Sequence, residues 1–318
     1  MKHQNIPILV LGYNRPNHIK KLISSLKKIK PKNIYISLDG PKNNLIDLKK
    51  SETVKKEIDK IDWSCVVKKR YNRKNLGCRN SVSNGINWFF GENRFGIILE
   101  DDCIPKKSFF IFCKKIDEKF GTNKKIFSIS GSNFFNKKID NEYFFSKYNH
   151  CWGWASWRRA WKYYDKNLSF WSKWKYSDQW KYFHDNIIEK KFWEKIFDKV
   201  LKKKIDSWAY VWTCSVWKKE GLTIIPKKNL IENIGFDMDA TNTIDKKRLY
   251  KKASNLKFKK KFNFTIPLVP FKENDEYVFK SHFKGKYYLW PWIIIKGLNL
   301  LIQNPWIFFI KLKKFILR

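Results

Sequence analysis

Three carboxylates stand in a row directly after an apolar run of residues. Glu100, Asp101 and Asp102 follow the run 95–99, which is typical of a buried strand. Like charges this close repel one another unless a cation neutralises them. Carboxylate oxygens favour Mg²⁺ or Mn²⁺, and such an ion can bridge a diphosphate and stabilise it as a leaving group. The triplet therefore indicates a divalent-metal site, and the alternative is an acidic turn that caps the next helix.

Polar residues also follow three other apolar runs in the first half of the chain. Asn14 and Arg15 follow the first run, Asp39 follows the second, and the segment 75–79 follows the third. In open parallel sheets, ligands bind beyond the carboxyl ends of the strands. We therefore expect these residues to share one edge of a sheet with the acidic triplet. The alternative is that they form only turns and a solvated helix surface.

The elements that would position these residues alternate regularly. Continuous apolar runs are typical of buried strands, and apolar residues at a spacing of three to four are typical of amphipathic helices. Their alternation predicts an α/β fold with a mostly parallel, doubly wound sheet and helices on both faces. The predicted strands are 6–11, 33–38, 65–67, 95–99 and 126–129, and the predicted helices are 19–29, 54–61, 82–90 and 109–120.

Several motifs, taken in their order, resemble those of GT-A glycosyltransferases. The chain is similar to bacterial family 2-type enzymes and to the N-acetylglucosaminyltransferase I family, which carries an EDD version of the DXD motif. The resemblance covers about residues 5–243 and implies a Rossmann-like GT-A domain. The motifs that carry it are 8–16, 37–40, 75–79 and 98–102, followed by a block at 151–161 that is similar to WGWATWRRAW and by the segment 221–236.

The resemblance implies a role for each polar residue after the strands. Asp102, the last acid of the triplet, would bind the metal ion, and Asp101 would face the sugar or ribose. Asp39 would contact uracil or ribose, and Arg79 would lie near the diphosphate. The residues that the resemblance assigns to the nucleotide-sugar site are Asn14, Arg15, Asp39, Arg79, Glu100 and Asp101.

The chain departs from the family pattern at the catalytic base. An inverting transferase needs a group that takes the proton of the acceptor hydroxyl. Relatives read IDTWDYQW where this chain has Ala209 in place of the second acid, and DATHT where it has Asn242 in place of His. Asp206 is the best remaining base, with an exposed loop acid as the alternative, and Asp237 and Asp239 are reserves. These departures also leave open a degenerate protein that binds substrate without turnover.

The block 151–161 is rich in tryptophan and has two interpretations. Aromatic faces stack on sugar rings, so Trp152 and Trp154 are candidates for an acceptor or donor-sugar site. Tryptophan at every second or third position also packs well in a core. We expect a mixture of both uses.

The charge is strongly positive, with 67 Lys and Arg against 29 Asp and Glu, a formal net charge of +38. Only nine of the basic residues are Arg. Readers of nucleic acid depend on bidentate Arg contacts, so no nucleic-acid partner is expected. A bias toward Lys in the composition explains part of the charge. Attraction to an anionic membrane surface would explain the rest.

The composition shifts after about residue 245 and divides the chain into three parts: the domain at 1–245, which the resemblance implies to be a transferase, a basic linker at 246–285 and a tail at 286–318. The uninterrupted apolar runs of the tail are too short to span a bilayer. The tail is rich in Trp and Tyr and ends in cations. Such a helical tail suits the membrane interface, and the alternative is that it packs back on the domain. We expect a cytoplasmic protein that is peripherally associated with the inner face of the cell membrane.

Together these features predict metal-dependent transfer of a sugar from a UDP-sugar to a glycan or lipid-linked saccharide, with inversion, in bacterial surface polysaccharide synthesis. A nucleotidyltransferase is a second enzyme hypothesis, but it would carry a Gly-rich phosphate loop that the segment 11–16 lacks. A third hypothesis, from a different class, is a basic protein without catalysis that binds anionic lipid or nucleic acid.

Deletion of the tail tests the membrane prediction. A chain without residues 286–318 should lose co-sedimentation with anionic vesicles at low salt, because the interfacial aromatic residues and the terminal cations are removed. Unchanged sedimentation would show that the tail does not serve the membrane.

Overall fold

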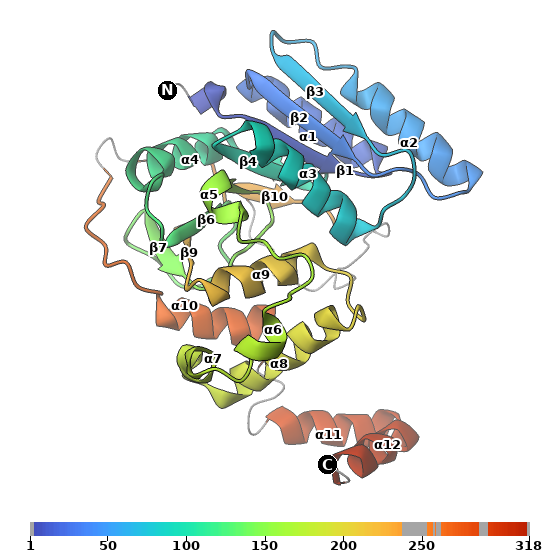
Figure 1. Cartoon of the computed structure of the whole chain (residues 1–318), viewed down its shortest axis with the longest axis vertical. Helices are drawn as coiled ribbons and strands as arrows, with labels where there is room; N and C mark the ends of the chain where they lie inside the picture. Colours follow the sequence, from blue (N-terminus) through green and yellow to red (C-terminus); the bar gives the residue numbers. More distant parts are fainter. Residues whose placement is uncertain (1–2, 237–252, 257, 259–261, 286–291, 317–318) are drawn as a thin grey trace.

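The computed structural model describes residues 3–236, 253–256, 258, 262–285 and 292–316 (Figure 1). Strands and helices alternate through its first half, which confirms the predicted α/β fold. Each strand and helix predicted there has a counterpart, but the helix predicted at 54–61 spans Leu45–Ile58, and the short strand Cys103–Pro105 was not predicted. The strands are β1 (Ile8–Gly12), β2 (Asn33–Leu38), β3 (Val66–Tyr71), β4 (Phe95–Glu100), β5 (Cys103–Pro105) and β6 (Ile126–Ser130). The helices are α1 (Pro16–Ile29), α2 (Leu45–Ile58), α3 (Cys78–Glu92) and α4 (Lys107–Phe120), after a 3-10 turn at His3–Asn5.

The second half adds strands that the sequence did not reveal and a further layer of helices. The strands are β7 (Tyr143–Ser146), β8 (Trp154–Trp157), β9 (Leu222–Pro226) and β10 (Ile231–Asn233). The helices are α5 (Arg158–Trp161), α6 (Trp171–Trp174), α7 (Asp178–Phe183), α8 (Ile187–Leu201) and α9 (Trp208–Lys218).

Eight strands form one large sheet in the order β3-β2-β1-β4-β8-β6-β9-β7, and β10 pairs with β5 in a small second sheet. The four strands from β3 to β4 are parallel, as predicted. β8 lies antiparallel between β4 and β6, and β7 lies antiparallel at the far edge. The sheet is therefore mostly parallel and Rossmann-like, with two reversed strands in its second half.

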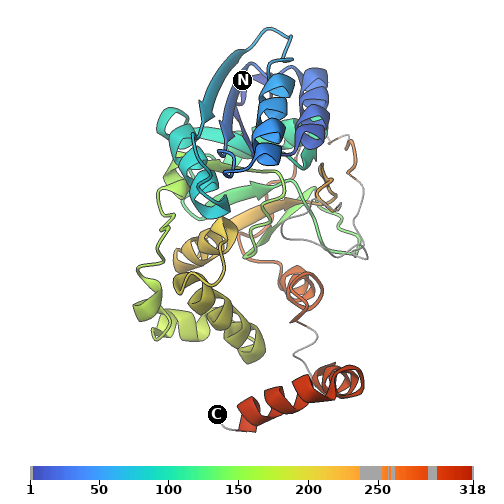
Figure 2. The same cartoon turned by 90° about the vertical axis from the view of Figure 1, so that its right-hand side faces the viewer.

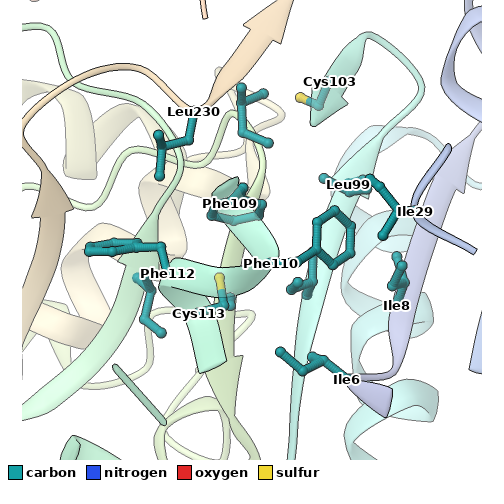
Figure 3. Close-up of a cluster of buried hydrophobic side chains, with 14 of the residues drawn as sticks. Ile6, Ile8, Ile29, Leu99, Cys103, Phe109, Phe110, Phe112, Cys113 and Leu230 are labelled. Carbon is teal, nitrogen blue, oxygen red and sulfur yellow. The ribbon is translucent and has the colours of Figure 1, made fainter. Parts of the chain in front are cut away.

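The alternation of side chains along β1 divides the core into two clusters. Ile8 and Val10 face a cluster that includes residues of α1, α2 and α4. Leu9 and Leu11 face a second cluster, formed with α3, α8 and α9. Figure 3 shows part of the first cluster, with Phe110 of α4 near Leu99 and Ile8. Helices thus cover both faces of the sheet, as expected for a doubly wound fold.

The described part of the predicted linker packs against the domain. Phe262 is 6% exposed and joins the cluster of α1 and α4, where it lies 6.3 Å from the ring of Phe112. Further along, helix α10 (Lys272–Tyr277) continues into a π-helical turn (Val278–His282), and Phe279 is buried in the second cluster. The lysines of this segment led to the prediction of a linker. Apolar side chains that recur between them, such as Phe262 and Phe279, are buried in the two clusters, so these residues belong to the folded domain.

The tail forms two helices, α11 (Trp292–Gln303) and α12 (Pro305–Ile316), which contact each other. Figures 1 and 2 draw them apart from the sheet and its helices. Large apolar side chains lie at their surface: Ile302 is 78% exposed and Trp306 is 79% exposed. Within the described residues, no helix has both the length and the apolar character that crossing a membrane requires.

Substitution of Phe262 tests the attachment of the C-terminal segment. Phe262→Ala should lower the free energy of unfolding by about 3 kcal/mol, because it removes a buried ring and leaves a cavity that the neighbouring side chains fill only in part. Phe309→Ala is the matched control: Phe309 is 58% exposed on α12, and its loss should change stability by less than about 0.5 kcal/mol. Urea unfolding of both variants measures the difference, and equal stability would show that the segment is not part of the core.

Candidate functional site

The pairing of β1 with β4 brings the first motif next to the acidic triplet. The two strands are parallel, and Leu11 lies opposite Glu100 in their register. The residues that follow both strands therefore emerge at the same edge of the sheet. This is also where the strand order reverses, since β2 lies on one side of β1 and β4 on the other. Such a switch point is where ligands bind in open α/β sheets.

Arg15 joins the two motifs by direct contact. Its Nη1 lies 3.3 Å from Oδ1 of Asp101 and 3.2 Å from Oδ2 of Asp102. All three side chains are largely buried, with exposed fractions of 16%, 9% and 18%. Burial alone would lower the pKa of Arg15, but the two carboxylates outweigh it and raise this pKa. Arg15 therefore remains a cation and marks a point that both carboxylates can reach.

One guanidinium does not balance three carboxylates. Burial raises the pKa of Glu100 to about 8, and the charges of Asp102 and Asp101 add to this shift. Burial and the charge of Asp102 likewise raise the pKa of Asp101 to about 7, against the opposing effect of Arg15. The triplet is thus a place where further positive charge would be stabilising.

The backbone of the segment 234–235 packs closely against Asp102. Ile234 donates its N–H to the carbonyl of Asp102 at 2.9 Å, so the chain after β10 lies over the triplet. A Cβ placed on Gly235 would come within 2.2 Å of Oδ2 of Asp102. Only glycine at this position allows the close approach, which keeps the side chain of Asp102 in place.

The residues fit a metal ion that is shared with a ligand. In the described part of the chain, no three His, Cys, Asp or Glu side chains form a group that could hold a metal by themselves. Mg²⁺ commonly uses one or two carboxylates and takes its other ligands from phosphates and water. Asp102, with Asp101 beside it, matches that smaller set.

Asp39, predicted to contact uracil or ribose, is hydrogen-bonded to the loop that leads into α3. Its two oxygens accept five hydrogen bonds from the chain, at 2.9 to 3.2 Å. The donors are the backbone N–H groups of Gly40, Leu76 and Gly77 and the side-chain amides of Asn72 and Asn75. Asp39 therefore fixes the loop 72–77 that leads into α3, and it would act on a ligand through that loop.

Asp47 is a residue that the sequence analysis missed. It is buried at the start of α2 and accepts hydrogen bonds from the side chains of Tyr13 and Asn14. Burial would raise the pKa of Asp47, but these bonds and one from the backbone of Lys42 lower it. The sequence did offer a signal for Asp47, because Asn44 is a typical N-cap residue and Asp47 stands three positions after it. In the structure Asn44 caps α2 and accepts a hydrogen bond from the N–H of Asp47 at 2.9 Å. Asn14 is thus held in the site region by α2.

Arg79 does not fit its predicted place beside the diphosphate. Its side chain is buried and donates to the backbone carbonyls of Val200, at 3.4 Å, and Lys166. These acceptors lie after α5 and near the end of α8, so the guanidinium points into the helical layer. Arg79 ties α3 to that layer and holds the start of α3 in place.

Asp206 lies at the rim of the same region. It is exposed in the loop before α9, and a Cβ on Gly77 would lie 3.4 Å from its Oδ2. The pKa of Cys78 is raised, first by partial burial and then by the charges of Glu100, Asp206 and Asp39. Asp206 is therefore close enough to share an electrostatic environment with the triplet. Asp237, Asp239 and Asn242 lie outside the described residues.

The two candidate tryptophans have different environments. Trp154 is 1% exposed and packs against Trp161, Trp208 and Trp212, so it has no free face for a sugar. The prediction of sugar stacking by Trp154 is therefore wrong, and the residue belongs to the core. Trp152 is half-buried and meets the edges of neighbouring aromatic rings, which include Phe236 at 5.6 Å.

The six cysteines are all free. Cys103 and Cys113 are buried in the first cluster and Cys214 in the second. Cys113 and Cys214 are packed among apolar residues, which is typical of structural thiols, whereas the thiol of Cys103 donates to Oδ1 of Asp102 at 3.3 Å.

Comparison with known proteins gives only a weak likeness. No family model and no curated protein matches the chain. A cytidylyltransferase structure from Leptospira borgpetersenii shares 12% identity and a TM-score of 0.31, over 50% of this chain and 62% of that one. A glucose-1-phosphate thymidylyltransferase structure from Bacillus anthracis shares 13% identity and a TM-score of 0.30, over 52% of this chain and 76% of that one. The chain thus spans less than two thirds of the first neighbour, and likeness at this level assigns no function.

Removal of the Asp39 carboxylate tests its role in the loop. Asp39→Ala leaves five donors without their acceptor and should cost about 3 kcal/mol of stability. Hydrogen exchange at the N–H groups of Leu76 and Gly77 should become faster, because both groups donate to Asp39. Asp140→Ala is the control, since the Asp140 side chain is 92% exposed. Unchanged exchange in the loop would contradict the assigned role.

Proposed function

We propose that this protein is a metal-dependent glycosyltransferase of the GT-A kind, which transfers a sugar from a nucleotide-sugar, with a UDP-sugar as the first candidate donor. One observation carries the proposal: Arg15 and the triplet at Glu100–Asp102 meet at the switch point between β1 and β4. The two motifs that contact there also belong to the set that resembles these enzymes. The other residues of the site are arranged around this contact.

The donor would bind with its diphosphate at Asp102 and Arg15. Asp102, with Asp101, would hold Mn²⁺ or Mg²⁺, which supplies neutralisation of the diphosphate as it leaves. Arg15 would contribute a second positive charge beside the metal ion, because its guanidinium already contacts both carboxylates. Glu100 and Asp101 would face the sugar or ribose, and Asn14 would lie beside the nucleotide, held there by Asp47.

Asp206 is the proposed base for the acceptor hydroxyl. It is exposed, so it can exchange protons with solvent, and it lies beside Gly77 at the rim of the site. A base in this position would take the proton while the sugar is transferred with inversion. The side chain of Trp152, which is half-buried, would contribute a wall of the acceptor or sugar site.

The acceptor would be a glycan or a lipid-linked saccharide of a bacterial surface polysaccharide. The exposed apolar residues of α11 and α12 support a location at the inner face of the membrane. Helices with an apolar surface and terminal cations bind at membrane interfaces without crossing them.

Donor binding is the direct test of the proposal. A panel of UDP-, GDP- and dTDP-sugars with Mn²⁺ should include one that raises the free energy of unfolding, by about 2.7 kcal/mol at a hundredfold excess over Kd. Asp102→Asn should remove the Mn²⁺-dependent part of this stabilisation and of donor hydrolysis. Asp140→Asn makes the same chemical change at an exposed acid and should leave both unchanged.

Each contrary result has a distinct meaning. Full Mn²⁺-dependent stabilisation of Asp102→Asn would place the metal elsewhere. No response to any donor would contradict the transferase proposal. Metal-dependent binding with no turnover would indicate a protein that keeps the donor site and lacks the base.

A further inference from the structure

A groove with a volume of about 710 Å³ runs along α1, on the side where β5 and the start of α4 pack. Its size is that of a small-molecule or oligosaccharide site. Asn17 lies at one end and Lys28 at the other, which on a helix corresponds to about 16 Å. None of the residues that line it has a part in the site described above.

Five lysines line this groove. Lys20, Lys21 and Lys28 come from α1, and Lys106 and Lys107 come from the start of α4. Lys106 lies 3.3 Å from Glu232. The other four have no acidic partner within 4 Å among the described residues. The groove is therefore a concave surface with uncompensated positive charge.

Lys106 and Lys107 lie at the N-terminus of α4, where positive charge is electrostatically unfavourable. They occupy the N-cap and the first residue of α4, and the first turn of that helix holds no acid. The N-terminus of a helix carries partial positive charge, so cations there are unfavourable. An anion bound between α4 and α1 would relieve both the helix terminus and the lysines.

Two serines in the middle of α1 create the hollow. Ser24 and Ser25 are small, so they leave space between the lysines on either side. The hydroxyl of Ser25 donates to the carbonyl of Pro105 at 2.8 Å, which fixes α1 against β5. The hydroxyl of Ser24 donates within α1 to Lys20 at 2.9 Å. The groove is thus a fixed feature of the packing between these elements.

One end of the groove lies near the candidate active site. Asn17 is two residues from Arg15, and Ile104 is two residues from Asp102. A chain molecule that lies along α1 can therefore place one end at the carboxylates. Asn17 and Asn255, at the groove surface, offer amide groups suited to sugar hydroxyls.

From this arrangement we infer that the groove binds an acceptor glycan that carries phosphate or carboxylate groups along its chain. The lysines hold the anionic groups while the free end of the glycan reaches the carboxylates. This inference rests on the proposed function and adds the chemical class of its acceptor.

Other polyanions fit the groove less well. The described residues of its lining include neither arginine nor aromatic side chains, so they offer no stacking faces of the kind that single-stranded nucleic acid uses. Figures 1 and 2 place α1 toward the end of the molecule opposite α11 and α12. A protein held on a membrane by those two helices would not bring the groove to the same lipid surface.

Binding of defined soluble anions tests the inference. Tetragalacturonate and inorganic tripolyphosphate should bind at low salt without metal, whereas the neutral maltotetraose should not. A variant with Lys20→Gln, Lys21→Gln and Lys28→Gln should bind both anions about tenfold more weakly or worse. Calorimetry of the full chain measures these affinities, and Ser24→Trp, which fills the groove without changing its charge, should weaken them as well.

A second triple variant separates the groove from the general basicity of the surface. Lys191→Gln, Lys195→Gln and Lys199→Gln remove the same charge from exposed positions on α8, away from the residues that line the groove on α1, and should leave the affinities within about twofold. Equal loss in both triple variants would overturn the inference. A second result would also overturn it: neither soluble anion binds the protein, and the groove variants lose binding to vesicles of phosphatidylcholine and phosphatidylglycerol.

The result is independent of the donor site. The groove variants should keep the Mn²⁺-dependent stabilisation by the donor, and Asp102→Asn should keep the binding of tetragalacturonate. If donor binding fails while groove binding holds, the proposed function is wrong and the groove remains an anion site. If donor binding holds while wild type and groove variants bind the anions equally, the acceptor class is wrong.

Discussion

The accumulation of negative charge at the end of β4 is the constraint that organises this molecule. Parallel pairing of β1 and β4 forces the acidic triplet and Arg15 to the same edge of the sheet. Because the triplet is largely buried, its charge cannot be left to solvent, and one guanidinium meets two of its carboxylates. The surrounding loops then have to hold Arg15 and Asp102 within reach of each other. Their anchors, Asp47 and the close approach at Gly235, serve that purpose.

The acidic residues near the sheet edge divide into two kinds. Asp39 and Asp47 are saturated by hydrogen bonds from neighbouring loops, so they shape the site and have little capacity left for a ligand. Asp102 accepts fewer hydrogen bonds, one from Arg15 and one from the thiol of Cys103, and Asp206 is exposed, so these two are the ones that chemistry can use. The type of residue is the same in all four cases. Burial and the number of donors decide which role each one has.

The sequence predicted the first four strands of the sheet, their parallel arrangement and the position of Arg15 and the triplet at one edge, because these follow from local periodicity and from the geometry of parallel strands. It did not reveal that β8 is antiparallel and buries Trp154, since a tryptophan-rich segment looks the same in a core and in a sugar site. It also took the region of Phe262 for a linker. There, long lysine side chains cover the buried rings, as Lys115 does over Phe262 at 4.9 Å, and only the tertiary structure shows the packing beneath.

The attachment of residues 262–283 has a consequence for the order in which the protein is made. Phe262 completes one hydrophobic cluster and Phe279 the other, so the two clusters cannot both be closed until the residues up to Phe279 have left the ribosome. Domains generally fold as units during synthesis. Helices α11 and α12 emerge after these residues. The domain can therefore close before these helices become free, and the apolar helices meet their surroundings only when a folded domain already precedes them.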